Sequence, residues 1–291
     1  MDPEGLSRAG CAEPAGVKVV KLERIVMKSL ALIAFFLMLA VVVNGQDWAK
    51  ERLEKSPRHL EWAKVKQGSR EVNCFVAYPE VSHKATAVII IHEIFGLTDW
   101  VRGVADQLAE AGYLVIAPDL LSGSAPGGGG TAELGSGDAV RKAISSLPPD
   151  QITADLDAVA KYVSSLPAAN GMLAVAGFCW GGSQAFRYAT NAKGLSAAFV
   201  FYGSGPEDGS AMARIEAPVH GFYAENDARV NSTIPQSKDL LAKAGKKFDA
   251  VIYGGAGHGF MRAGEAPDAS FANKKAREDA WKRWKTLLSA L

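Results

Sequence analysis

A short, almost continuous apolar run, Ala85–Ile91, is the feature that most constrains how this chain can fold. β-Branched residues dominate it and no charged residue interrupts it, which favours a strand buried on both faces of a parallel sheet. A helical pattern follows over Val101–Ala111, and a second strand pattern follows at Tyr113–Ala117. This strand–helix–strand alternation predicts an α/β fold in one domain, with a mostly parallel central sheet flanked by helices.

The same alternation continues to the end of the chain. Further strand patterns occur at Arg70–Tyr78, Leu173–Ala176, Ala197–Phe201, Val219–Tyr223 and Phe248–Tyr253. Helical spacing of apolar residues occurs at Asp155–Leu166, Gly182–Thr190 and Lys274–Leu291. The charged segment Trp48–Lys66 is expected at the periphery, and the Gly- and Ser-rich stretch Ser122–Gly137 is expected to form a mobile loop.

The N-terminal part of the chain has the features of an export signal. Residues Met27–Ser29 open an apolar run, Leu30–Val43, which ends at Asn44-Gly45-Gln46. A basic start, an apolar stretch of this length and a small residue near its end are typical of a secretory signal peptide. An uncleaved anchor and a buried helix are the alternatives, although the run is short for a membrane span. We therefore predict a signal peptide over residues 27–45.

This interpretation sets the other domain boundaries and the expected location. Residues 1–26 are mixed in composition and weakly patterned, and Met27 would make an ordinary signal start. We therefore interpret residues 1–26 as an upstream region outside the native protein, and residues 46–291 as the mature domain. The protein is expected to be periplasmic or secreted, with no stable membrane partner once the signal is cleaved.

Charge balance and cysteine content exclude several classes of function. The 32 Lys and Arg residues nearly balance 31 Asp and Glu residues, and the scattered charges show no footprint of a nucleic-acid binder. Cys11, Cys74 and Cys179 are too few for a disulfide framework, and no Cys/His cluster has the spacing of zinc ligands. Neither nucleic acid nor a metal is therefore expected as a partner, and Cys74, inside a predicted strand, is expected to be a small packing residue.

The strongest chemical motif is Gly177-Phe178-Cys179-Trp180-Gly181-Gly182, between a predicted strand and a predicted helix. This is the nucleophile-elbow pattern with Cys179 in the place of serine. The glycines are needed because the turn is tight and side chains there would clash with the strand and the helix. The turn also puts the sulfur at a helix N-terminus, whose partial positive charge favours the thiolate.

An acid and a histidine follow the elbow in the expected order. Asp227 lies just beyond the strand Val219–Tyr223, and His258 lies in a glycine-rich loop after the strand Phe248–Tyr253. Both positions fall at the carboxyl edge of a parallel sheet, where open α/β sheets bind ligands. We therefore predict a catalytic triad of Cys179, His258 and Asp227, with Glu225 as the alternative acid.

A second motif, His92-Glu93-Ile94-Phe95-Gly96-Leu97, directly follows the buried strand Ala85–Ile91. An early strand–helix loop of this kind donates a backbone N–H to an oxyanion hole, and the residue after the nucleophile donates the other. The sequence therefore predicts that the amides of Ile94 and Trp180 stabilise the charge that develops on a carbonyl oxygen.

Together these motifs resemble the dienelactone hydrolase (carboxymethylenebutenolidase) family over roughly residues 60–291. The resemblance is carried by His-Glu-Ile-Phe-Gly, Gly-Phe-Cys-Trp-Gly-Gly and Gly-Ala-Gly-His-Gly-Phe, and also by Ile116–Leu120 and Phe201–Gly203. It implies an α/β-hydrolase fold, a Cys-His-Asp triad, no cofactor, and hydrolysis of a small-molecule ester or lactone. In such enzymes the cysteine forms a thioester intermediate.

The resemblance also implies two further site residues. Glu93 would hold the resting thiol until substrate arrives, with a structural ion pair as the alternative role. Arg262, four residues after His258, would bind a substrate carboxylate. The family's second arginine has no secure counterpart, because Arg141 is only nearby. The substrate could therefore be a dienelactone, or another ester met outside the cytoplasm; a secreted binding module without turnover is the non-enzymatic alternative.

Overall fold

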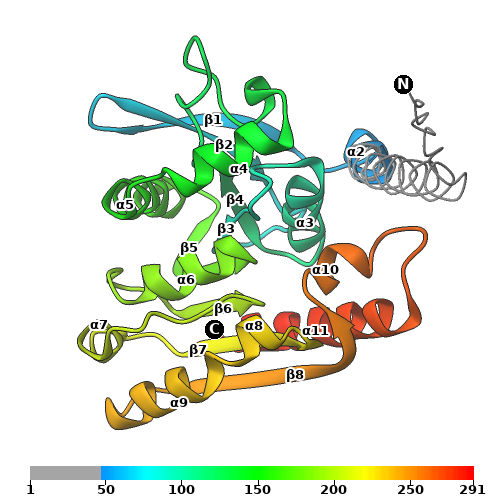
Figure 1. The fold of residues 1–291 in the computed structure, drawn as a ribbon. Helices are drawn as coiled ribbons and strands as arrows, with labels where there is room; N and C mark the ends of the chain where they lie inside the picture. Colours follow the sequence, from blue (N-terminus) through cyan, green and yellow to red (C-terminus); the bar gives the residue numbers. More distant parts are fainter. Residues whose placement is uncertain (1–46) are drawn as a thin grey trace, which may run out of the picture. The chain divides into compact units, whose positions relative to one another are not determined.

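The computed structural model describes residues 47–291 (Figure 1). The predicted signal peptide over 27–45 and the upstream region 1–26 lie outside the described residues. Among residues 47–291, no helix is both long and apolar enough to span a bilayer. No group of His, Cys, Asp and Glu side chains in the same residues could hold a metal ion.

An eight-stranded sheet in the order β1-β2-β4-β3-β5-β6-β7-β8 forms the centre of the domain. The strands are β1 (Leu60–Gln67), β2 (Arg70–Ala77), β3 (Ala85–Ile91), β4 (Leu114–Pro118), β5 (Ala169–Phe178), β6 (Ala197–Phe201), β7 (Val219–Asn226) and β8 (Phe248–Gly257). Only β1 and β2 run antiparallel to their neighbours, and all pairs from β4 to β8 are parallel. The predicted mostly parallel sheet is therefore confirmed.

Helices cover both faces of this sheet (Figure 1). The longer ones are α2 (Asp47–Glu54), α3 (Asp99–Glu110), α4 (Gly137–Ser145), α5 (Pro149–Ser165), α6 (Trp180–Ala189), α9 (Ile234–Lys243) and α11 (Phe271–Leu288). The short ones are η1 (Ala132–Leu134), α7 (Gly209–Ala213), α8 (Ala228–Asn231) and α10 (Phe260–Ala263). Most predicted elements are present, with ends that differ by a few residues.

Strand β3 shows why its apolar run is continuous. Ile89 and Ile91 point to the core that packs against α5 and α6, whereas Val88 and Ile90 point to the core that packs against α3 and α11. Successive side chains of a strand face opposite sides, so a strand between two helical layers needs apolar residues at every position. All residues of β3 are buried.

Two segments can be compared with what the sequence predicted for them. The segment Trp48–Lys66 lies at the edge of the sheet, as expected, and forms most of helix α2 and of strand β1, which pairs with β2 along its whole length. Only Ala63 and Val65 of β1 are buried, because the strand lies at the edge of the sheet. The stretch Ser122–Gly137 is a loop that contains the short helix η1 and makes hydrogen bonds to the core, which are described below.

Candidate active site

The elbow between β5 and α6 has the tight geometry that its glycines predict. Cys179 has φ +56° and ψ −117°, a conformation that an L-residue rarely adopts and that costs free energy. A Cβ at Gly177 would lie 2.0 Å from the Gly181 carbonyl oxygen, and a Cβ at Gly181 would lie 2.3 Å from the His92 carbonyl oxygen. Only glycine therefore fits beside the nucleophile position.

Three strand ends bring the predicted triad together. Cys179 follows β5, Asp227 follows β7 and His258 follows β8. The Nε2 atom of His258 lies 3.1 Å from the Sγ atom of Cys179, and its Nδ1 atom lies 2.5 Å from Oδ2 of Asp227. Asp227 is buried, whereas His258 and Cys179 are partly exposed. The imidazole thus lies between a sulfur and a carboxylate, as a nucleophile–base–acid relay requires.

Electrostatics favour a charged imidazole at this position. The hydrogen bond with the Cys179 sulfur and that with Asp227 raise the pKa of His258 to about 9, against the opposing effect of burial. The raised pKa favours the imidazolium form of His258 at neutral pH, and in that form the ring N–H can donate a hydrogen bond to the Cys179 sulfur.

The alternative acid, Glu225, does not reach the histidine. It lies at the exposed end of β7, where Oε2 accepts a hydrogen bond of 2.7 Å from the backbone N–H of Gly255 in β8. This contact joins the ends of the two neighbouring strands. The structure therefore favours Asp227 over Glu225 as the partner of His258.

The two predicted oxyanion donors lie beside the nucleophile. A cavity of about 280 Å³ is lined by Ile94, Cys179, Trp180, Ser183, Tyr202, Ser204, Arg229 and Val230. Within residues 47–291 neither the Ile94 amide nor the Trp180 amide donates a hydrogen bond to another protein group. Trp180 is the first residue of α6, where the N–H has no intrahelical acceptor. Both amides are thus available to a ligand oxygen.

Glu93 and Arg262 contact each other rather than the groups that the resemblance implies. The Nε atom of Arg262 donates to Oε2 of Glu93 over 2.8 Å, and Glu93 is almost fully buried. A guanidinium is a stronger hydrogen-bond donor to a carboxylate than a thiol is. In this conformation, therefore, Glu93 does not hold the Cys179 thiol, and Arg262 already has an anionic partner.

Two other residues lie away from this site. Arg141 is on the exposed face of α4 and pairs with Asp138. Cys74 is fully buried in β2, and burial raises the pKa of its thiol. The expectation that Cys74 is a packing residue is confirmed, and both Cys74 and Cys179 are free thiols.

Tyr202 is a site residue to which the motif analysis gave no role. It follows β6, has φ +40°, is fully buried and packs edge-on against His258 with ring centroids 5.1 Å apart. It also lines the cavity beside Cys179. Its place in Phe201-Tyr202-Gly203, after a predicted strand, was the signal that could have identified it.

Thr131 is a second such residue, and it connects the Gly-rich stretch to the loop that contains Ile94, the predicted oxyanion donor. Its Oγ1 atom accepts a hydrogen bond of 3.1 Å from the backbone N–H of Leu97, three residues after Ile94. The same hydroxyl donates to Asp119 Oδ1 over 2.7 Å, and the Thr131 N–H donates to Asp119 Oδ2 over 2.7 Å. A Cβ at Gly96 would lie 2.4 Å from Thr131 Oγ1, so the two loops are in close contact.

Replacing Thr131 by valine should weaken both the fold and catalysis. The Leu97 amide and the Asp119 carboxylate would each lose a partner, which costs about 1–3 kcal/mol of unfolding free energy. The loop that contains Ile94 would also lose a support, and small displacements of catalytic groups can lower kcat by up to about 10²-fold. Urea unfolding and ester turnover measure the two effects. Thr286→Val, on the exposed face of α11, is the control. Lower stability with unchanged kcat would limit Thr131 to a structural role.

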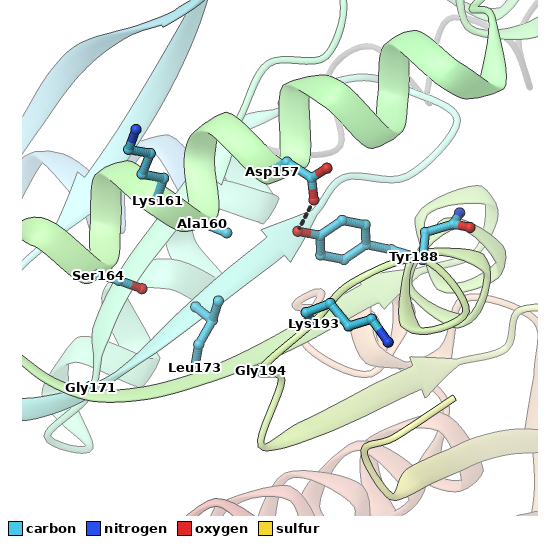
Figure 2. A pocket seen from close by; sticks show the side chains of 10 residues that line it. Asp157, Ala160, Lys161, Ser164, Gly171, Leu173, Tyr188, Lys193 and Gly194 are labelled. Carbon is cyan, nitrogen blue, oxygen red and sulfur yellow. Dashed lines mark hydrogen bonds between the residues drawn. The ribbon is translucent and has the colours of Figure 1, made fainter. Parts of the chain in front are cut away.

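A larger cavity, of about 420 Å³, lies at the opposite ends of the strands and is lined by none of the predicted triad residues (Figure 2). It lies between α5 and the residues around the end of α6, and Gly171 and Leu173 of β5 contribute to its wall. Its Tyr188 hydroxyl donates to Asp157 over 2.8 Å (Figure 2). Its lysine Lys193 pairs with Glu216. Two polar side chains of this cavity thus have protein partners.

Comparison with known proteins agrees with this geometry. The profile of the dienelactone hydrolase family matches residues 72–291, more than half of the chain. A provisionally named carboxymethylenebutenolidase of Saccharolobus solfataricus is 30% identical over 251 residues, covering 75% of this chain and 93% of that protein. A provisionally named carboxymethylenebutenolidase of Methylorubrum extorquens is 30% identical over 223 residues, covering 73% of this chain and 74% of that protein.

Solved structures show the same architecture. The crystal structure of a provisionally named dienelactone hydrolase from Klebsiella pneumoniae has a TM-score of 0.70 and 26% identity, covering 80% of this chain and 99% of that chain. A dienelactone hydrolase-like promiscuous phosphotriesterase from metagenomic libraries has a TM-score of 0.67 at 20% identity, covering 80% of this chain and 98% of that chain, which supports the shared fold. This chain therefore belongs to the dienelactone hydrolase family, and it is an ester and lactone hydrolase with the α/β-hydrolase fold.

Proposed function

We propose that this hydrolase cleaves its substrate by nucleophilic catalysis through Cys179, with His258 and Asp227 as the other members of the triad. The observation that carries the proposal is the position of His258, 3.1 Å from the Cys179 sulfur and 2.5 Å from Asp227. The raised pKa of His258 favours its imidazolium form, which can stabilise a Cys179 thiolate through a hydrogen bond once that thiolate forms.

The reaction proceeds in two halves. The Cys179 thiolate attacks the carbonyl carbon, and the carbonyl oxygen takes the negative charge and accepts hydrogen bonds from the Ile94 and Trp180 amides. The tetrahedral adduct collapses when the carbon–oxygen bond breaks, and the leaving alkoxide takes a proton from His258. In a lactone the new hydroxyl remains attached to the acyl group.

Water completes the cycle by hydrolysing the thioester. Neutral His258 removes a proton from the water as it attacks the thioester carbonyl, and the carbon–sulfur bond then breaks. This step releases the carboxylic acid, and the thiolate and the imidazolium are restored. Asp227 is not protonated in this cycle; it orients the imidazole and stabilises its positive charge.

We also propose that the protein acts outside the cytoplasm, after removal of the signal peptide predicted at residues 27–45. The apolar run Leu30–Val43 behind a basic start supports this location. The substrate would then be a dienelactone or another small ester present in the periplasm or the medium. Esters of another class remain the alternative, because the counterpart of one family arginine is missing.

The test of the catalytic proposal is to trap the acyl-enzyme. Mixing the protein with excess 4-nitrophenyl acetate and quenching with acid should give protein that carries one acetyl group by intact mass. Peptide mapping should find that group on the peptide that contains Cys179, in a linkage that hydroxylamine cleaves. The buried Cys74 is the internal control and should stay unmodified. An acetyl group found only on a serine would contradict the proposal. Turnover that persists after Cys179 has been alkylated would contradict it as well.

A further inference from the structure

His92 connects the two segments that supply the predicted oxyanion donors. It follows β3, is fully buried and stands two residues before Ile94. Its backbone carbonyl oxygen is the atom that excludes a Cβ at Gly181, the second residue of α6. Its ring lies nearly parallel to the indole of Trp180, with ring centroids 5.4 Å apart and an interplanar angle of 18°. One buried residue therefore contacts the elbow through both its backbone and its side chain.

The imidazole of His92 has a tautomer that follows from its acceptor. The Nδ1 atom lies 2.8 Å from the backbone carbonyl oxygen of Glu93. A carbonyl oxygen only accepts, so Nδ1 carries the hydrogen and donates it. Burial lowers the pKa of His92, against the opposing charge of Asp119, so the ring is neutral at neutral pH and Nε2 carries no hydrogen. Within residues 47–291 no group forms a hydrogen bond with Nε2. The side chain is thus oriented through Nδ1 and through its stacked face.

The carbonyl that accepts this hydrogen bond belongs to the same peptide unit as the Ile94 amide. A peptide unit is planar and trans, so its C=O and N–H bonds point in opposite directions. A contact that holds the Glu93 carbonyl therefore also sets the direction of the Ile94 N–H. The same carbonyl accepts a second hydrogen bond, of 3.1 Å, from the Gly96 N–H, which closes a tight turn. Two hydrogen bonds thus hold one side of the peptide unit whose other side carries the predicted oxyanion donor.

We propose that His92 is a positioning residue for the oxyanion hole. Its Nδ1–H fixes the peptide unit that carries the Ile94 amide, and its ring supports Trp180, which carries the second amide. The inference rests on the proposed function and deepens it, because it names the group that orients the oxyanion donors. A hydrogen bond to the Glu93 carbonyl also polarises the peptide unit, which strengthens the Ile94 N–H as a donor. His92 is not among the residues that line the cavity at Cys179, so it acts through its neighbours.

The test compares two reactions of the Cys179 thiol. Acylation by 4-nitrophenyl acetate develops negative charge on a carbonyl oxygen and depends on the oxyanion hole. In alkylation by iodoacetamide, the sulfur bonds to the methylene carbon as the carbon–iodine bond breaks, and the carbonyl oxygen takes up no such charge. Both reactions need the same thiolate. A defect in the oxyanion hole therefore slows the first reaction and spares the second, whereas a defect in the thiol or in the fold slows both.

His92→Phe keeps an aromatic ring beside Trp180 and removes the Nδ1–H donor. We expect the second-order rate constant for acylation to fall about 10- to 100-fold, because the complete loss of an oxyanion donor costs about 10²–10³-fold. The rate constant for alkylation should change by less than about twofold, since the His258 contact with the sulfur is kept. Rapid-mixing measurement of released nitrophenolate gives the first rate constant, and intact mass over time gives the second.

Two further variants separate the hydrogen bond from the stacked ring. His92→Asn loses the ring but keeps an N–H donor at the δ position, so it should recover part of the acylation rate that His92→Phe loses. His220→Phe is the matched control, because the His220 ring stacks on Phe199 with centroids also 5.4 Å apart and an interplanar angle of 20°, near the start of β7. This control should keep both rate constants. Circular dichroism checks that each variant folds, and His92→Leu replaces His92→Phe if the latter does not.

The outcomes separate this inference from the catalytic proposal. Equal losses of acylation and alkylation in His92→Phe would mean that His92 supports the thiol or the fold, and would overturn the inference. Unchanged acylation would overturn it as well, as would a His92→Asn variant no faster than His92→Phe. If the catalytic proposal itself is wrong, the unmodified protein carries no acetyl group on Cys179, which peptide mapping detects without any variant of His92.

Discussion

Replacing Cys179 by alanine is expected to reduce ester turnover at least about 10³-fold, since loss of a nucleophile removes the covalent pathway altogether. The fold should remain, because the side chain is partly exposed and alanine is smaller. Cys179→Ser should also be strongly impaired. A serine hydroxyl is much less acidic than a thiol, so His258 would generate the nucleophile less readily. Steady-state kinetics with 4-nitrophenyl acetate, together with circular dichroism, measures activity and fold.

Cys74 provides the matched control for this experiment. It is the other cysteine of residues 47–291 and is buried in β2, away from solvent. Cys74→Ala removes a thiol of the same kind, and we expect turnover close to that of the unmodified protein with a small loss of stability from the cavity left behind. Near-normal activity of Cys179→Ala would sink the nucleophile assignment. Loss of activity in both variants would indicate a general effect of thiol removal.

Replacing Asp227 by asparagine should have the second largest effect. The carboxylate fixes the orientation of His258 through a hydrogen bond of 2.5 Å, and the amide would favour the wrong tautomer. We expect kcat to fall roughly 10³-fold. This is less than the effect of the same change in an enzyme with a serine nucleophile, because a thiol loses its proton more readily than a hydroxyl does. Glu225→Gln is the control: it removes an acidic residue two positions earlier, which contacts Gly255 instead.

Asp227→Asn should also lower the pKa of His258. Asp227 is one cause of the raised pKa of His258, after the hydrogen bond with Cys179. The imidazolium is present below about pH 9 and is lost as the pH rises through that value. Without the carboxylate, the pKa of His258 falls toward its ordinary value. Alkylation of Cys179 by iodoacetamide depends on the thiolate, which the imidazolium can stabilise. This stabilisation should therefore disappear at a lower pH in the variant than in the unmodified protein. NMR titration of the His258 ring measures the pKa directly. An unchanged pKa in Asp227→Asn would contradict the role of this contact.

The sequence predicted those features that depend on neighbours along the chain. Strand β3 could be located with its observed ends because its apolar run is continuous, and the elbow could be located because its glycines stand next to Cys179. The order of Asp227 and His258 after the elbow then predicted two residues that the fold brings together across three strands. These inferences needed only local patterns and the direction of parallel strands.

Features that depend on distant partners could not be predicted in the same way. Strand β1 is charged and becomes a strand by pairing with β2 at the sheet edge. Thr131 acts through Asp119 and Leu97, which are 12 and 34 residues away in sequence. For Glu93 and Arg262, 169 residues apart, the sequence revealed each residue but not that they bind each other.

The backbone of the elbow separates what the fold requires from what the chemistry requires. Gly177 and Gly181 are required by carbonyl oxygens that lie within 2.0 and 2.3 Å of where a Cβ would be, so the fold itself requires glycine at these positions. The fold does not require a cysteine at position 179 in the same way, because its own backbone would be less strained with glycine. A related protein that lost catalysis would therefore be expected to keep the glycine pattern after losing the thiol. In such a protein the glycine spacing would indicate the fold, and the proposed nucleophile, acid and histidine would indicate whether activity is retained.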